Sequence, residues 1–273
     1  YSKKDITKNR IDNMRIAWKY CNSVYDVLVP NLRIPHIKYC FEHGIYTKNN
    51  KEHYLTSSMV PVVKTVFDLM LDYALESELI DKNYSRLISL QNMENLKYSV
   101  QSGHMAFSDE ELDILWNNCK NKEVQLILIN CYTGFRPSEL ISVRNENINL
   151  DEKYIIGGSK TKAGTNRLVP IHPKIYDFIK QFKTDKKYLF EEYGTNGYQR
   201  YRKTFNNIMD LYKMDPSHKL HDCRKTFVTI AKKYDLNEYA IKYIVGHSIT
   251  DITEKTYTER DPKWLYSEIL KIK

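Results

Sequence analysis

The sequence feature that most limits the fold is an apolar stripe at helical spacing between Ser58 and Leu79. Its members are Met59, Val63, Val66, Phe67, Met70, Leu71 and Ala74. This spacing places them on one face of a helix, which must be buried against other helices. Residues 11–29 show a similar rhythm, and glycine is rare in residues 1–100. We therefore expect a small all-α domain of about four short helices.

A change of pattern divides the chain. The helical spacing of apolar residues stops in the segment SVQSGHMAFS, which ends at Ser108. A new helix follows, and Ser108 and Glu111 have the spacing of a capping box at its start. We expect residues 1–103 to form a helical domain with its linker, and residues 104–273 to form a second domain.

Two β-rich segments lie inside the second domain. INLDEKYIIGG and NRLVPI flank the polar turn SKTKAGT, and they are typical of strands in a small hairpin or sheet. From Pro173 onward the pattern is helical again. The expected fold class is mainly α with a small β-sheet, in which an all-helical domain precedes a mixed α/β domain.

The charge balance favours a polyanionic partner. The 273 residues include 42 Lys and Arg against 34 Asp and Glu, a net charge of +8, and the pI is near 9.0. The 5 cysteines form no C-x-x-C pair, which indicates reduced thiols in a cytosolic protein, not disulfides or a zinc site. Neither a membrane span nor a signal peptide is evident. The start at Tyr1 indicates a fragment or a processed product.

The segment TGFRPSEL holds Arg136 at a helix boundary. Gly134 favours a turn and Pro137 suits the first position of a helix, so the arginine between them is fixed in place. A purely structural alternative is that Arg136 caps the helix or pairs with Glu139.

The segment HKLHDCRKTFVTIAKKYDL predicts a helix that begins near Asp222. Arg224 precedes Phe227 and Val228 by three and four residues, so it falls on the inward face. A buried arginine cannot lose its charge and needs an anion. The structural alternative is that it bridges two buried carbonyls. His221, one turn earlier, could reach the same anion.

The segment after residue 237 predicts a short helix from about Glu238 to Val245, which Gly246 stops and His247 follows. Tyr257 lies ten positions later on what should be another short helix, and it is one of 22 tyrosines, most of which serve in packing. Lys160 and Lys162 lie in the turn SKTKAGT, where a lysine is usually solvated. No G-K-[ST] ending makes this turn a P-loop.

Together these residues suit one substrate, a phosphodiester. Two arginines can hold both non-bridging oxygens and stabilise the charge of a pentacoordinate phosphorus. Histidines can donate to the phosphate or accept a phenolic proton, since their pKa lies near neutrality. The lysine can protonate the leaving 5′ oxygen, and the phenol of Tyr257 becomes a usable nucleophile beside fixed guanidinium charges.

The order R, K, HxxR, GH, Y, within TGFRPSEL, SKTKAGTNRLVPI, HDCRKTF, VGHSITDIT and KTYTE, resembles the tyrosine recombinase (phage-type integrase) family. The resemblance covers about Ser108 to Lys273, and the first domain resembles the family's core-type DNA-binding domain in general pattern. It implies the catalytic set Arg136, Lys160, His221, Arg224, His247 and Tyr257, with Lys162 as the alternative lysine. Cys223 and Lys225 depart from the residues that the family most often has there.

The resemblance also implies a C-shaped clamp round duplex DNA, in which Tyr257 forms a 3′-phosphotyrosyl bond and frees a 5′ hydroxyl. Four protomers act in a synaptic complex through a Holliday junction at the ends or attachment sites of a mobile element. No metal or high-energy cofactor is required. Such integrases typically carry an extra N-terminal arm-binding module, and the start at Tyr1 leads us to expect that a module of this kind was truncated. The tail DPKWLYSEILKIK packs in its own core or docks on a neighbouring protomer.

Other basic residues are candidates for DNA phosphate contacts, which make binding salt-dependent: Lys3, Lys4, Arg10, Arg15, Lys19, Arg200, Arg202 and Lys203. The abundance of Lys, Asn, Ile and Tyr indicates an AT-rich genome, so we expect a nucleoid-associated protein of a bacterial cytoplasm.

Three rival functions remain, and the first of them would use the same catalytic residues. A type IB topoisomerase would relax supercoils as a monomer without a specific site. A non-catalytic repressor would explain the charge alone. A metalloenzyme would be built on His218, His221, Cys223 and His247, but the H-x-x-H spacing is not that of zinc proteases.

Overall fold

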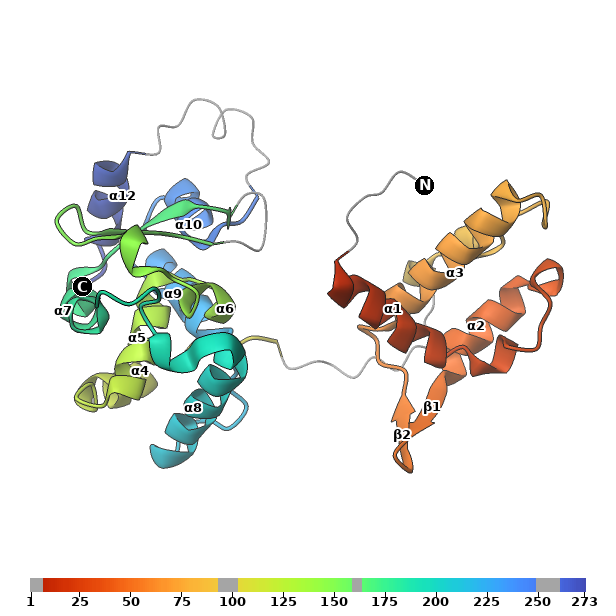
Figure 1. The fold of residues 1–273 in the computed structure, drawn as a ribbon, viewed down its shortest axis with the longest axis horizontal. Helices are drawn as coiled ribbons and strands as arrows, with labels where there is room; N and C mark the ends of the chain where they lie inside the picture. The colour runs from red at the N-terminus through yellow and green to blue at the C-terminus, as the bar shows by residue number, and fades with distance from the viewer. Residues whose placement is uncertain (1–6, 93–102, 159–163, 249–260) are drawn as a thin grey trace. The chain divides into compact units, whose positions relative to one another are not determined.

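The computed structural model describes residues 7–92, 103–158, 164–248 and 261–273. The chain divides into two compact units, Tyr1–Gln101 and Ser102–Lys273, drawn in Figure 1. Lys3, Lys4, Lys160, Lys162 and Tyr257 lie outside the described residues. In the described part of the chain, no helix combines the length and apolarity needed to cross a bilayer.

The first unit packs three helices around one apolar core. The helices are α1 (Lys8–Lys19), α2 (Ile34–His43) and α3 (Val60–Glu76), joined by the 3₁₀ turns η1 (Asn22–Val24) and η2 (Val29–Asn31) and followed by η3 (Ser85–Leu87) and η4 (Leu90–Asn92). The predicted stripe forms the buried face of α3, because Val63, Phe67 and Leu71 are almost fully removed from water. Phe41 of α2 packs against them in the same cluster.

One expectation for the first unit was wrong. The unit is not all-helical, because β1 (Ile45–Lys48) and β2 (Lys51–Tyr54) form an antiparallel hairpin. Asn49 and Asn50 connect the strands with φ of 52° and 58°, the left-handed conformation that a two-residue hairpin turn requires. In residues 11–29, which show a similar apolar rhythm, α1 ends at Lys19 and 3₁₀ turns follow.

The second unit surrounds a buried helix with helices and a small sheet. The helices are α4 (Asp109–Asn117), α5 (Lys122–Thr133), α6 (Pro137–Leu140), α7 (Pro173–Phe182), α8 (Gly197–Leu211), α9 (Asp222–Lys233), α10 (Glu238–Val245) and α12 (Pro262–Ile269). The 3₁₀ turns η5 (Asn145–Asn147) and η7 (Glu191–Asn196) lie between them. Every residue of α5 from Val124 to Thr133 is buried, and the helix contacts α4, α7, α8 and α9.

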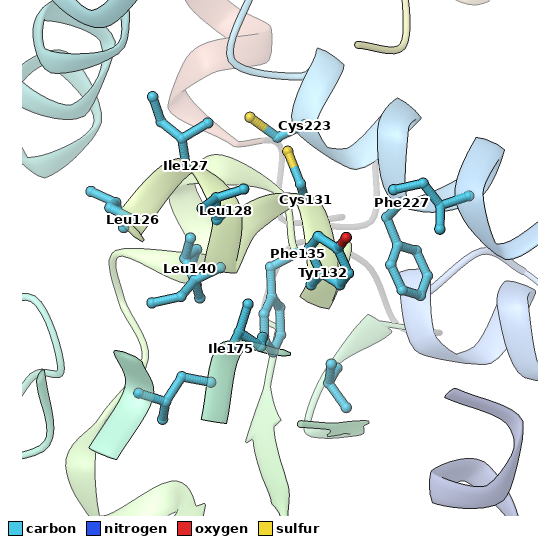
Figure 2. Close-up of a cluster of buried hydrophobic side chains, with 14 of the residues drawn as sticks. Leu126, Ile127, Leu128, Cys131, Tyr132, Phe135, Leu140, Ile175, Cys223 and Phe227 are labelled. Atoms are coloured by element: carbon cyan, nitrogen blue, oxygen red, sulfur yellow. The ribbon is translucent and has the colours of Figure 1, made fainter. Parts of the chain in front are cut away.

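Figure 2 shows the core around α5, where Phe135 and Phe227 lie among aliphatic side chains. Cys223 of α9 is fully buried beside Cys131 of α5, and this proximity contributes to the raised pKa of Cys131, although removal from water is the larger cause. The position where the sequence departs from the family pattern is therefore a packing position between two helices. Lys225, the other departure, is exposed.

The sheet has three antiparallel strands in the order β3 (Ile148–Asn149), β4 (Tyr154–Gly157) and β5 (Arg167–Pro170). The register pairs Gly157 with Arg167, so β4 and β5 flank the segment that was predicted to be a turn. The predicted strands are confirmed, and the fold class, mainly α with a small β-sheet, is confirmed as well.

Local signals placed several helix ends correctly. Ser108 accepts a hydrogen bond from the backbone N–H of Glu111, and the Glu111 carboxylate accepts one from the Ser108 N–H, which is the predicted capping box. Helix α9 begins at Asp222, and α10 spans Glu238–Val245 with Gly246 as its left-handed cap.

The C-terminal helix α12 packs on its own unit. Leu265 and Ile269 are fully buried in the core cluster, and α12 contacts β5. The Glu268 carboxylate also accepts a hydrogen bond of 2.7 Å from the backbone N–H of Asn237, just before α10. Of the two readings of the tail, packing in its own core is the one observed here.

Candidate active site

Arg136 lies between the end of α5 and the start of α6. Helix α5 ends at Gly134 with a φ of 62°, and a Cβ there would lie 2.6 Å from the ring of Phe227. Pro137 opens α6 one residue after the arginine. The Arg136 guanidinium donates to Glu139 at 2.9 Å, so the predicted pairing is present, and 15% of the side chain stays exposed.

Arg167 is a site residue that sequence reasoning missed. It is 1% exposed on β5 and donates to Glu139 at 2.8 Å, to the carbonyl of Ile244 at 2.7 Å and to the carbonyl of Gly164 at 2.9 Å. Its guanidinium also lies 4.8 Å from the ring centroid of Phe135. The available signal was a charged residue inside the apolar strand NRLVPI, because such a residue is rarely buried without partners.

Arg224 lies in the first turn of α9 and is 7% exposed. Its Nη1 donates to the carbonyl of Gly134 at 2.9 Å. Its Nη2 is buried and has no hydrogen-bond partner among the described residues. The carbonyl alternative required two acceptors, and one is observed within the described ranges. Burial first, and then the charges of Arg136 and Arg167, lower the pKa of Arg224 to about 9, so the group stays charged at neutral pH.

His247 is fixed by the end of α10. Gly246 has a φ of 68°, and a Cβ there would lie 2.8 Å from Cα of Gly164 and 3.1 Å from a guanidinium nitrogen of Arg167. The backbone N–H of His247 bonds to the carbonyl of Lys242 at 2.9 Å. Partial removal from water, followed by the charges of Arg224, Arg136 and Arg167, lowers the pKa of His247. The structure therefore brings this histidine to the arginines.

His221 forms the N-terminal boundary of α9, one turn before Arg224. Its carbonyl accepts the backbone N–H of Arg224 at 3.1 Å. Its half-buried ring stacks on His104, with ring centroids 5.3 Å apart and planes inclined by 28°. His104 comes from the segment just before α4, so two distant parts of the sequence meet at this histidine.

A hydrogen-bonded chain lies behind these two histidines. The Asp222 carboxylate is 1% exposed and contacts Nδ1 of His104 and Nδ1 of His218, each at 3.0 Å. It also accepts the backbone N–H of Lys219 at 2.8 Å. Nε2 of His218 lies 3.1 Å from the Glu111 carboxylate. The start of α9 is thereby tied to the start of α4.

The metal-site alternative is not supported by this arrangement. His218 is held by two carboxylates, Cys223 is buried in the core, and His221 stacks on another histidine. In residues 7–92, 103–158, 164–248 and 261–273, no group of three or more His, Cys, Asp or Glu side chains is placed to hold a metal ion.

The candidate DNA contacts that can be located are all exposed: Arg10, Arg15 and Lys19 on α1, and Arg200, Arg202 and Lys203 on α8. Arg15 contacts Asp12 at 3.4 Å, and Lys19 lies over the ring of Tyr46. Arg200 donates to the carbonyl of Glu192 at 2.9 Å.

The site that results is rich in positive charge. Arg136 and Arg167 both pair with the Glu139 carboxylate, and Arg224 lies near enough to be affected by all three charges. In the part of the second unit that the structure describes, three guanidinium charges therefore face one carboxylate, which leaves two of them uncompensated. Such a cluster, with a buried donor left unsatisfied, is suited to an oxyanion, because charge-assisted bonds to guanidinium groups are strong and geometrically specific.

Comparison with known proteins gives a consistent picture. The model of the phage integrase family matches residues 106–263. "Tyrosine recombinase XerA" from Pyrococcus horikoshii is 27% identical over 178 residues, which cover 62% of this chain and 61% of that protein. The chain therefore spans less than two thirds of the length of the curated relative that it matches.

Two solved structures share the fold. The integrase of the Tn1549 transposon, in complex with a circular intermediate DNA, aligns with a TM-score of 0.72 and 16% identity over 94% of this chain and 91% of that one. A lambda integrase dimer bound to a COC′ core site aligns with a TM-score of 0.68 and 12% identity over 91% of each chain.

Proposed function

The chain belongs to the phage integrase family, and we propose that it is a site-specific tyrosine recombinase that cleaves and rejoins duplex DNA through a 3′-phosphotyrosyl intermediate. The observation that carries the proposal is the buried, unsatisfied Nη2 of Arg224 beside two further arginines. A buried donor of this kind costs free energy unless a partner reaches it. A DNA phosphate supplies that partner.

Each site residue has a role in the cleavage step. Arg136 and Arg224 hold the two non-bridging oxygens and stabilise the charge that develops on them. The phenolic oxygen of Tyr257 attacks phosphorus, the bond to the 5′ oxygen breaks, and a histidine accepts the phenolic proton. His247 suits this task because its lowered pKa favours the neutral ring at neutral pH. Lys160, or alternatively Lys162, gives a proton to the leaving oxygen.

Arg167 and Glu139 have a positioning role in this proposal. Their salt bridge joins β5 to α6, and the Arg167 Nε–H donates to the carbonyl of Ile244, three residues before His247. Glu139 also fixes Arg136. The pair therefore sets the spacing between Arg136 and His247.

The assembly is part of the proposal. Residues 1–103 serve as the core-type DNA-binding domain and residues 104–273 as the catalytic domain of a clamp. Four protomers act together on the ends or attachment sites of a mobile element in a bacterial cytoplasm. The C-terminal helix α12, which packs on its own unit in the single chain, moves to a neighbouring protomer in the complex.

The first test uses a nicked duplex that carries the element's end sequence, so that cleavage releases a short fragment and traps the covalent intermediate. Wild type, Tyr257→Phe and Tyr266→Phe are compared on a denaturing protein gel. We expect a shifted band for wild type and for Tyr266→Phe, the control at the next tyrosine of the chain, and none for Tyr257→Phe.

Two outcomes would contradict the proposal. A shifted band for Tyr257→Phe means that another of the 22 tyrosines attacks. Relaxation of a supercoiled plasmid that lacks the element's ends, at the rate seen for one that carries them, favours a topoisomerase.

A further inference from the structure

We infer that the pocket on the outer side of His221 binds a second DNA phosphate, which flanks the one that reacts. This inference rests on the proposed function and adds a substrate contact to it. The pocket has a volume of about 440 Å³ and is lined in part by His104, Tyr198, Arg202, Asn206, Lys219 and His221.

Three separate segments build the pocket. One wall is helix α8, a second is the segment that leads into α9, and the third is the segment that precedes α4. His221 belongs to this lining and also stands one turn from Arg224. A strand of DNA whose phosphate is held by Arg224 therefore passes the mouth of the pocket.

The wall of the pocket formed by His104 and His221 is held in place by the buried carboxylate of Asp222. Nδ1 of His104 contacts the buried carboxylate of Asp222 at 3.0 Å, and the His104 ring stacks on His221. The side chain of His104 nevertheless remains 52% exposed. An aspartate that fixes one ring nitrogen leaves the other edge oriented for a further partner, as in metal and catalytic sites.

Helix α8 contributes one arginine, Arg202, to the wall of the pocket. Tyr198, Arg202 and Asn206 are spaced by four residues, so they share one face of the helix, and that face lines the pocket. Arg202 has no acidic partner within hydrogen-bond distance among the described residues. Arg200, two positions earlier, is absent from the lining and donates to a backbone carbonyl. The sequence made both arginines candidates for phosphate contacts, and we retain Arg202 and assign no phosphate to Arg200.

The lining indicates the chemical class of the ligand. It presents an arginine, a lysine and the rings of His104 and His221, whereas the third histidine of the lining, His218, is buried between two carboxylates. In the part of the chain that the structure describes, no carboxylate lines the pocket. A small organic ligand usually needs mostly apolar walls. Side chains of this kind, on an exposed surface next to a phosphate site, suit a backbone phosphate, which positions DNA without reading its sequence.

The pair Arg202→Ala and Arg200→Ala tests the inference, because both residues are exposed, carry the same charge and lie on one helix. Binding of a non-specific 20-base-pair duplex is measured by fluorescence anisotropy across a series of KCl concentrations. Loss of one phosphate contact should reduce the slope of log K against log salt by about 0.9. We expect this reduction for Arg202→Ala and an unchanged slope for Arg200→Ala. Equal slopes in the two variants would overturn the inference.

A second experiment locates the phosphate. In the nicked duplex, single phosphates near the nick are replaced in turn by neutral methylphosphonates, and affinity is measured. At one flanking position the replacement should weaken binding by wild type and by Arg200→Ala several-fold but leave binding by Arg202→Ala unchanged. The same loss in Arg202→Ala at every position would overturn the inference.

The two proposals can fail separately. If wild type forms no covalent adduct but Arg202→Ala still removes one phosphate contact, the proposed function fails and the phosphate site stands. If the adduct forms but Arg202→Ala behaves as Arg200→Ala, the phosphate site fails and the function stands.

Discussion

The two units of the chain each contain a network of ion pairs, and the networks differ in their charge balance. In the first unit Lys64 and Arg86 face Asp68 and Asp72, two cations against two carboxylates. In the described part of the second unit, Arg136 and Arg167 pair with Glu139 and Arg224 adds a third cation beside them. The balanced network has a structural role in holding α3 to the turn that follows it. The unbalanced network needs a further anion to neutralise its charge. This difference in charge balance distinguishes a functional site from a network that only stabilises the fold.

The largest effect should come from removing the single carboxylate of the unbalanced network. Glu139→Gln leaves three buried or half-buried guanidinium groups without a counter-charge, which should lower the free energy of unfolding of the second unit by about 3 kcal/mol or more. The matched change Asp72→Asn removes a partly exposed partner and should cost about 1 kcal/mol or less.

Urea unfolding followed by tryptophan fluorescence can measure both. Trp18 packs on the core of the first unit, while Trp116 and Trp264 pack on the core of the second. Equal losses in the two units would mean that the charge imbalance has no energetic consequence.

A cation of each network can be removed in the same way. Arg224→Ala should lower the rate of covalent adduct formation about 10²–10³-fold, the typical cost of one donor to a developing oxyanion, while DNA binding changes little. Arg86→Ala should leave the rate unchanged. Single-turnover cleavage of the nicked duplex at saturating protein makes the comparison, and full activity in Arg224→Ala would remove this arginine from the site.

An added anion should stabilise one unit only. Inorganic pyrophosphate, in place of chloride at equal ionic strength, should raise the unfolding free energy of the second unit by about 1.4 kcal/mol at ten times its dissociation constant. The first unit, whose charges are already paired, should not respond. Thermal unfolding read from the same tryptophans gives the result, and an equal shift in both units would indicate a general salt effect.

The smallest effect concerns pH. The pKa of His247 lies below its ordinary value of about 6.5, so below that pH the unfolded chain binds more protons. The contribution of His247 is complete above pH 6.5 and is lost as the pH falls. The pKa of Asp72 is lowered mainly by its hydrogen bond to Arg86, so its contribution is lost only below about pH 4. The second unit should therefore weaken first on acidification, and His247→Ala should remove part of that early loss.

The sequence predicted those features of the fold that depend on local signals. The stripe of α3, the capping box at Ser108 and the glycine cap of α10 act within one or two helical turns, so each can be read from adjacent residues. The hairpin from Ile45 to Tyr54 was not predicted, because its strands are largely exposed and lack the alternation of apolar and polar residues that indicates a strand.

The site residues divide in the same way, into those that local signals predicted and those that depend on contacts between distant parts of the chain. Arg136 was predicted from its place at a helix boundary and Arg224 from its place on the inward face of a helix, and the structure brings them together with His247. Arg167 had one local signal, its place in an apolar strand, but it was missed because two of its partners, Glu139 and Ile244, lie 28 and 77 positions away. The contact of His104 with Asp222 spans 118 positions and was missed for the same reason. The assignments of Tyr257, Lys160 and Lys162 remain predictions.

The complete burial of α5 has a consequence for how the protein is made. This helix leaves the ribosome long before α7, α8 and α9, the helices that cover it. Among the four helices that pack on this apolar helix, only α4 is made before it, and α9 is complete only when residue 233 has been synthesised. Domains generally fold as units. Arg136, three residues after the end of α5, reaches its final place only when α9 docks. A ribosome stalled before α9 should therefore carry an aggregation-prone nascent chain with no functional site.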